Sequence, residues 1–132
     1  MPYQISWEDR GVSFQYTGLT SDGEVAAAVR HVEADERFDR VRYTIHDFLK
    51  CGGATYTIQK VEEIAALDAA AAMSNLGIRK LSIAVITDRE DVATMARTYM
   101  VSRIHPHTMR IFSSLDEAHA WLRSEGLRQV GN

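Results

Sequence analysis

The sequence lacks several features that would assign it to a specialised class of protein. Its single cysteine, Cys51, has no second cysteine to pair with, which excludes an internal disulfide and a zinc cluster built on cysteines of one chain. No apolar run approaches the roughly 18 residues of a membrane span. Residues 1–8 resemble a strand rather than the basic and then apolar segment of an export signal. We therefore expect a cytoplasmic protein without a membrane span.

A marked excess of one charge is also absent. The formal net charge is −3, and the acidic and basic residues, which make up 25% of the chain, are interspersed. We expect no nucleic-acid partner, because binding to phosphates relies on clustered positive charge. With 132 residues, 45% of them hydrophobic, the chain has the size and composition of one domain. We expect that domain at residues 1–126, with a frayed tail at 127–132.

What the sequence does contain is a regular succession of strand and helix patterns. It opens with two stretches in which apolar and polar residues alternate, on either side of Asp9-Arg10-Gly11. Such alternation around a turn predicts a β-hairpin with one buried face. The apolar positions of this hairpin are Ile5, Trp7, Val12, Phe14 and Tyr16.

Capping signals mark the starts of three helices. A serine or threonine followed three residues later by glutamate is the capping-box spacing, and it occurs at Ser21, Thr87 and Ser114. The apolar residues that follow recur every three or four positions, as they do on one face of a helix. These signals predict a helix at 22–34, another from Thr87 to near Arg103, and a last one beginning at Ser114.

A further helix, the longest, is expected from about Thr57 to Leu76. Apolar residues repeat at helical spacing there, and Asn75 and Gly77 follow as stop signals. The segment Lys50-Cys51-Gly52-Gly53 before it is predicted to be a loop, because paired glycines relax the backbone restriction that favours a continuing element.

The remaining strands are expected at 41–47, 81–86 and 109–112. Residues 81–86 are almost continuously apolar, which is typical of a strand covered on both faces and predicts the middle of the sheet. Strands that alternate with helices are parallel when right-handed crossovers join them. The predicted fold class is therefore α/β, in the order ββαβαβαβα, with a mostly parallel five-stranded sheet flanked by four helices.

The closing part of the chain runs from Arg110-Ile111-Phe112 into Ser114-Leu115-Asp116-Glu117-Ala118 and Ala120-Trp121-Leu122. This run resembles the last strand and helix of the STAS domains, which occur in anti-sigma-factor antagonists and in regulatory regions of sulfate transporters. The order and length of the elements resemble the bacterial SpoIIAA-like proteins more closely, over nearly the whole chain. The resemblance implies a curved sheet flanked by helices and a function that is more often regulatory or ligand-binding than catalytic.

The phosphorylation switch of that family is a serine two residues after an aspartate, between the third strand and the second helix. The matching aspartate in this sequence is Asp47, and the serine position falls on Leu49, which has no hydroxyl group. The resemblance therefore implies a member without the usual phosphoacceptor. Thr55 and Thr57 lie nearby but outside that spacing, and we interpret one of them as the cap of the long helix.

The predicted topology selects a first group of candidate binding residues. In open α/β sheets, ligands usually bind beyond the carboxyl ends of the parallel strands, where a helix N-terminus attracts anions and glycines let a ligand approach the backbone. We therefore expect a small anionic or apolar ligand to bind there. The candidates are His46, Asp47, Cys51, Gly52, Gly53, Thr87 and Asp88. The plainer interpretation is that these residues only form loops and helix caps, and we favour it for Thr87 and Asp88.

Two arrangements would carry chemistry if the fold assembled them. Cys51 lies beside Lys50 with His46 five residues away, which is compatible with an activated thiol and its base, although a lone cysteine is more often a small apolar residue. His105 and His107 have the spacing of a metal-ligand pair. We expect them at the amino end of the last strand, roughly 20 Å from His46, so we predict no shared active site, no metal and no cofactor.

A second group of candidates lies at the amino ends of the predicted parallel strands. Eight basic or imidazole side chains gather there, while the carboxyl ends gather Asp47, Asp88, Glu90, Asp91 and Asp116. An acidic partner protein or an anionic ligand would bind this basic edge, although ordinary scatter of surface charge is the simpler interpretation. The basic edge comprises Arg40, Arg42, Arg79, Lys80, Arg103, His105, His107 and Arg110, of which the last six are the candidate partner-binding residues.

Apolar residues on the third predicted helix extend beyond one stripe. Tyr99, Met100 and Ile104 continue the apolar surface, and methionine and tyrosine are favoured at interfaces. Core packing explains most of this surface, and a homodimer interface is the alternative.

These observations favour a regulatory or binding module of the STAS/SpoIIAA-like type that recognises a protein partner without serine phosphorylation. The family resemblance and the absence of a coherent catalytic group of residues support this hypothesis. The alternative is a protein that binds a small ligand at the carboxyl ends of the strands. A thiol-dependent enzyme that uses Cys51 is the third hypothesis.

Overall fold

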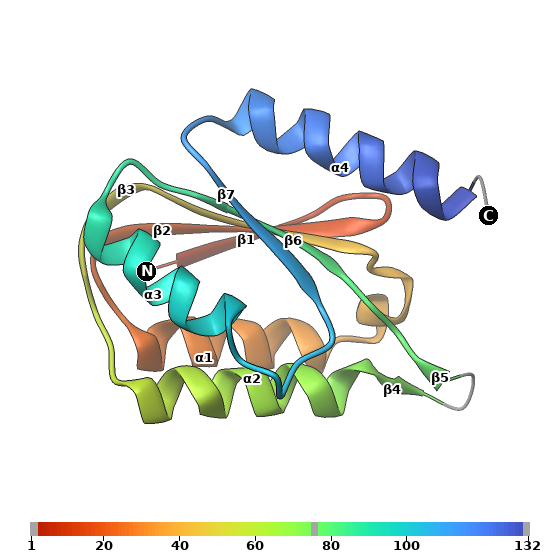
Figure 1. Ribbon diagram of the computed structural model, residues 1–132, viewed down its shortest axis with the longest axis horizontal. Coiled ribbons are helices and arrows are strands. Elements are labelled where there is room, and N and C mark those ends of the chain that lie inside the picture. Colours follow the sequence, from red (N-terminus) through yellow and green to blue (C-terminus); the bar gives the residue numbers. More distant parts are fainter. Residues whose placement is uncertain (1–2, 75–76, 131–132) are drawn as a thin grey trace.

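In the computed structural model, which describes residues 3–74 and 77–130, one five-stranded sheet lies between two layers of helices. Figure 1 shows α1, α2 and α3 on one face and α4 on the other. The strands are β1 (Tyr3–Trp7), β2 (Gly11–Ser21), β3 (Tyr43–Thr55), β6 (Ser82–Ile86) and β7 (Thr108–Phe112). The helices are α1 (Asp22–Glu33), α2 (Ile58–Ala72), α3 (Glu90–Met100) and α4 (Leu115–Val130). A short 3-10 helix (Glu36–Arg40) precedes β3, and the pair β4 (Met73–Ser74) and β5 (Gly77–Ile78) follows α2.

The sheet confirms the predicted fold class. Its strand order is β1-β2-β3-β6-β7, with β1 antiparallel to β2 and the other neighbours parallel. All five residues of β6 are buried, as expected for a strand covered on both faces. The central strand is β3, however, and not β6, because the N-terminal hairpin adds two strands beside β3 while only β7 lies beyond β6.

Three of the expected helix caps are present. The Ser21 hydroxyl accepts a hydrogen bond from the Glu24 N–H, the Thr57 hydroxyl accepts one from the Lys60 N–H, and Ser114 accepts one from the Glu117 N–H. The prediction for Thr87 is wrong. Its hydroxyl accepts a bond from the Arg89 N–H two residues on, and α3 begins after Arg89 without a side-chain cap.

The segment Lys50-Cys51-Gly52-Gly53, predicted to be a loop, is part of β3. This strand does not end near Asp47 but continues to Thr55 beside β2, which has 11 residues. The register shifts between these strands near Gly18, which has a positive φ of 71°, so the glycines serve an irregular strand pair rather than a loop. The two strands extend beyond the region paired with β6 and form a two-stranded ribbon at the carboxyl end of the sheet.

Several helix ends differ from the prediction. α2 ends at Ala72 rather than near residue 76, because Met73 leaves the helical conformation and begins β4. The expected stop at Asn75 and the end at Leu76 fall on the two residues that lie outside the described part of the chain. α3 ends at Met100 rather than near Arg103, and α4 continues to Val130, so residues 127–130 of the expected frayed tail are helical.

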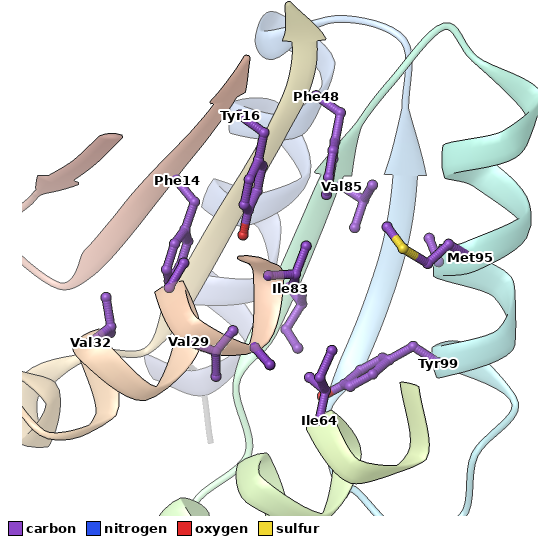
Figure 2. Packing of buried hydrophobic residues seen from close by; sticks show 14 of the residues in the cluster. Phe14, Tyr16, Val29, Val32, Phe48, Ile64, Ile83, Val85, Met95 and Tyr99 are labelled. Atoms are coloured by element: carbon purple, nitrogen blue, oxygen red, sulfur yellow. The ribbon is translucent and has the colours of Figure 1, made fainter. Parts of the chain in front are cut away.

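The core has two parts, one on each face of the sheet. Between the sheet and α1–α3 lies the larger part, which includes Phe14, Val29, Ile83, Val85 and Met95 (Figure 2). Between the sheet and α4 lies a smaller part, which contains Ile45, Ala84, Ile86, Ala118, Trp121 and Leu122. Alternation along β3 directs Ile45 toward α4 and its neighbours Thr44 and His46 toward the larger core. Two polar side chains of the central strand are therefore buried.

Candidate functional site

His46 lies in the larger core and not in a crevice at the end of the sheet. It is 9% exposed, and its ring stacks on Phe14 with 4.4 Å between the ring centroids. The Tyr16 hydroxyl and the Nδ1 atom of His46 form a hydrogen bond of 2.9 Å. Burial lowers the pKa of His46 to about 4, so its imidazole is neutral at physiological pH. His46 is close to the carboxyl end of the part of β3 that pairs with β6, but β3 continues to Thr55 and the His46 ring is buried in the core instead of lining a crevice.

A pair of carboxyl groups lies near the ends of the helices that cover this core. Asp68 of α2 is 9% exposed and accepts a hydrogen bond from the Tyr99 hydroxyl of α3. Glu33, the last residue of α1, forms a side-chain hydrogen bond with Asp68. Burial and then this neighbouring carboxyl group raise the pKa of Glu33 far above its ordinary value, so the pair retains a proton at neutral pH. Three helices thus meet at one protonated carboxyl pair.

His105 and His107 are also buried and have structural partners. The ring of His105 stacks on Tyr99 at 4.0 Å between centroids, and its Nε2 is 2.8 Å from the Tyr99 carbonyl oxygen. The Nδ1 of His107 accepts a hydrogen bond of 3.0 Å from the Leu81 N–H. Burial lowers the pKa of His107. Among the described residues, no three His, Cys, Asp or Glu side chains are arranged to hold a metal ion.

The histidines are closer in space than the sequence analysis predicted. His46 and His107 line one small cavity, together with Asp68 and Glu33. His46 pairs with Val85, one position before the last pair between β3 and β6, and its ring is buried in the core rather than placed beyond the end of the strand. The structure therefore brings together a polar group of residues that the sequence analysis divided between two ends of the sheet.

The other residues expected at the carboxyl ends do not surround His46. The Cys51 thiol is buried and its Sγ donates a hydrogen bond of 3.1 Å to the Gly53 carbonyl oxygen. At about 3.3 Å per residue, Cys51 is roughly 16 Å along β3 from His46, so the thiol and imidazole are not assembled as nucleophile and base. Asp47 accepts a bond from the Leu49 N–H, and Gly53 is buried beside Leu19. Gly52 and Asp88 are exposed, and Thr87 is buried.

The expected basic edge is only partly available to a partner. His105 and His107 are buried, so their side chains are not accessible to a partner. The Arg79 guanidinium lies over the Phe38 ring and donates to the Phe38 carbonyl oxygen at 2.7 Å. Lys80, Arg103 and Arg110 are exposed. Nearby, a surface hollow of about 350 Å³ is lined by Asp9, Arg10, Asp39, Arg40 and Arg42, so acidic side chains interrupt the positive charge there.

The carboxyl end of the sheet presents exposed apolar side chains instead. Leu19 of β2 is 79% exposed, Leu49 of β3 is 41% exposed, and Ile58, the first residue of α2, is 61% exposed. We call these three residues the carboxyl-end surface. A second exposed group, Met100 and Ile104, follows the end of α3. Tyr99 does not belong to it, because its ring is buried and its hydroxyl bonds to Asp68.

Sequence reasoning missed Glu33 and Asp68, although one signal for Asp68 was present. Asp68 follows Val61 and Ala65 at helical spacing, on the stripe of α2 that faces the core. A carboxyl group on such a stripe indicates a buried partner. Glu33 gave no comparable signal of burial, since acidic residues on amphipathic helices usually face the solvent.

Comparison with known proteins supports the fold. No protein-family model matches the sequence, and no curated protein matches it. Among solved structures, the unphosphorylated anti-sigma factor antagonist SpoIIAA is similar over 92% of this chain and 97% of its own, with 11% identity and a TM-score of 0.57. An uncharacterised DUF3478 protein from Shewanella loihica, which has a SpoIIAA-like fold, is similar over 91% of both chains, with 14% identity and a TM-score of 0.55. No described helix is long and apolar enough to cross a membrane. The chain therefore has the SpoIIAA-like fold, as its order of elements suggested.

Proposed function

We propose that this chain is a regulatory or binding module that recognises a protein partner through its carboxyl-end surface. The fold supports the proposal, because one of the similar structures is described as an antagonist of an anti-sigma factor, a name that states an action on another regulatory protein. The separation of Cys51 from His46 also favours binding over thiol chemistry.

The observation that carries the proposal is the exposure of Leu19, Leu49 and Ile58 at one end of the molecule. Single exposed leucines are ordinary, but several exposed apolar side chains on paired strands and on the helix that follows them favour an interaction site. β2 and β3 are paired along the ribbon, and α2 begins directly after β3. The Thr57 N–H at the start of α2 donates to Asp22 at the start of α1, which fixes the helices to the end of the ribbon.

Charges of both signs surround this end of the sheet. Asp88 follows β6 and is exposed, while the exposed Lys50 is next to Leu49 and Arg89 lies beside Gly53. A complementary surface would place apolar side chains on the leucines. We therefore propose a partner whose binding surface is apolar at its centre.

Recognition would not depend on a serine phosphate at the position that the family resemblance implies. That position is Leu49, whose side chain is 41% exposed and has no hydroxyl group. An apolar residue there favours a contact that is made constitutively, because burying a leucine on binding is favourable at all times.

Site-specific photo-crosslinking in cells of the source organism tests the proposal. A photoreactive amino acid is introduced in turn at position 19, at position 49 and, as a control, at the exposed Arg123 of α4. We expect one discrete protein adduct shared by positions 19 and 49 and absent at position 123. The same amino acid is also introduced at Lys80 and at Arg103, and an adduct at these positions instead would move the partner to the basic edge and contradict the proposal. Equal, nonspecific labelling at every position would contradict the proposal.

A further inference from the structure

Two small cavities adjoin each other between the sheet and the helices α1–α3. The larger has a volume of about 60 Å³ and is lined mainly by apolar side chains, among them Val29, Val85 and Met95 (Figure 2). The smaller has a volume of about 20 Å³ and is lined by apolar side chains together with polar ones that include Thr44 and His107. Both cavities are lined by His46, Asp68, Val29 and Ile83. Polar side chains are therefore more frequent around the smaller cavity than around the larger one.

A buried polar atom at the smaller cavity has no partner. Within residues 3–74 and 77–130, the Oγ1 atom of Thr44 makes no hydrogen bond, and this residue is 6% exposed. His46 uses Nδ1 for its hydrogen bond with Tyr16, and the residue lines both cavities. Leaving a buried hydroxyl unsatisfied costs about 1–3 kcal/mol, so such groups normally bond to protein or to a bound molecule. Thr44 and His46 are two residues apart on β3, and their side chains leave the same face of the strand.

The volumes limit what can bind. About 20 Å³ exceeds the roughly 10–15 Å³ that one water-sized group requires, whereas about 60 Å³ is well below the roughly 150 Å³ of an apolar cavity that accepts benzene. A molecule with one small polar group and a short apolar body matches both compartments.

The charge of the lining limits the polar group. His46 is neutral, and the Glu33–Asp68 pair keeps one proton and one negative charge, so an anionic group would be repelled and would meet no lysine or arginine among the described residues of the lining. A hydroxyl group is neutral and can donate and accept at the same time. It therefore fits the Thr44 hydroxyl together with either tautomer of His46.

We propose that the two cavities form one binding site for a small neutral alcohol, with the hydroxyl group between Thr44 and His46 and the alkyl part between Val29, Val85 and Met95. This site lies under the helices and is distinct from the carboxyl-end surface. It is also distinct from a crevice at the carboxyl ends of the strands.

Titration of the full chain with 1-propanol, followed by the NMR signals of its methyl groups, tests this site. We expect saturable shifts at the methyl groups of Thr44, Val29 and Ile83. Thr44→Val keeps the shape and removes the hydroxyl, and we expect it to weaken propanol binding about tenfold, or about 1.4 kcal/mol. Xenon, which has no hydroxyl group, should bind the wild type and this variant equally.

A second variant tests the apolar compartment. Ala96 lines the larger cavity, and Ala96→Leu places its added carbon atoms in that space, so we expect propanol and xenon binding to be lost. Linear shifts spread over the surface would overturn the proposal, as would propanol binding that Thr44→Val leaves unchanged. Ordered water that propanol fails to displace from the smaller cavity, beside Thr44, would also overturn the proposal. If Ala96→Leu does not fold, the Thr44→Val comparison still decides.

Discussion

Glu33 and Asp68 show how a pair of residues can set the pH dependence of this protein. The two carboxyl groups share a hydrogen bond beneath the helix ends, where burial disfavours a second negative charge. The unfolded chain has no such restriction and ionises Glu33 near its ordinary pKa of 4.5. Above that pH the unfolded chain releases a proton that the folded chain keeps. Stability therefore falls as the pH rises from about 4.5 toward the raised pKa.

The substitution Glu33→Gln should remove this fall of stability with rising pH. Glutamine cannot ionise, and its amide group can donate a hydrogen bond to Asp68. We expect the variant to be more stable than the wild type at pH 8, with a difference that shrinks toward pH 5. Urea unfolding at the two pH values measures it, with Glu62→Gln on the exposed side of α2 as the control. Equal pH dependence of Glu33→Gln and the wild type would show that the pair holds no extra proton.

His46 should make the free energy of unfolding depend on pH in the opposite direction. The unfolded chain binds a proton at this residue below the ordinary pKa of 6.5, whereas the folded chain binds it only below about pH 4. This term should lower stability as the pH falls through that window, by about 3 kcal/mol at roughly 1.4 kcal/mol per pH unit. His46→Phe should lose this part of the slope, while exposed His31→Phe should keep it. Denaturant unfolding at intervals between pH 4 and 7 gives both slopes.

At the scale of single elements, two glycines predict opposite effects of the same substitution. A Cβ atom at Gly11 would lie 2.2 Å from Cε1 of Tyr43, so the Tyr43 ring must move. This movement would break the hydrogen bond that the Tyr43 hydroxyl donates to the Glu8 carboxylate. A Cβ atom at Gly126 meets nothing within 4 Å, and this residue lies inside α4. We expect Gly11→Ala to destabilise the protein by about 1–3 kcal/mol. We expect Gly126→Ala to stabilise it by about 0.5–1 kcal/mol.

Thermal and urea unfolding of the two variants check this pair. A double-mutant cycle identifies the cause, because Gly11→Ala should cost little when Tyr43→Ser has removed the ring. If Gly11→Ala lowers the stability of the Tyr43→Ser variant as much as that of the wild type, the strain comes from the backbone of the turn and not from Tyr43.

The elements themselves were largely predictable because their signals are local. Ser21, Thr57 and Ser114 mark helix starts by hydrogen bonds to residues three positions away, and such spacing is visible in any sequence. The course of β3 was not predictable in the same way. Gly52 and Gly53 favour a loop locally, but pairing with β2 keeps them in a strand, and that partner is distant in sequence.

At the scale of the whole molecule, the polar group in the core could not be predicted from spacing. Glu33, His46, Asp68 and His107 come from α1, β3, α2 and the segment before β7, and they meet only because three helices converge on one face. His46 and His107 were predicted to lie at opposite ends of the sheet, because strand spacing gives the separation of backbone positions and not the reach of side chains. Both side chains line the same small cavity, although the pairing of β3 with β6 ends at Asp47 as the predicted strand did.

The proposed function belongs to this scale as well, because the carboxyl-end surface combines residues of β2, β3 and α2. The most direct test is the affinity for the partner captured by crosslinking, measured by calorimetry with the full chain. Leu19→Ser combined with Leu49→Ser should weaken binding at least about tenfold, since each leucine loses an apolar contact worth about 1–3 kcal/mol. Val101→Ser, at a residue 78% exposed beyond α3, is the matched control and should bind as the wild type does. An unchanged affinity of the double variant would contradict recognition through the carboxyl-end surface.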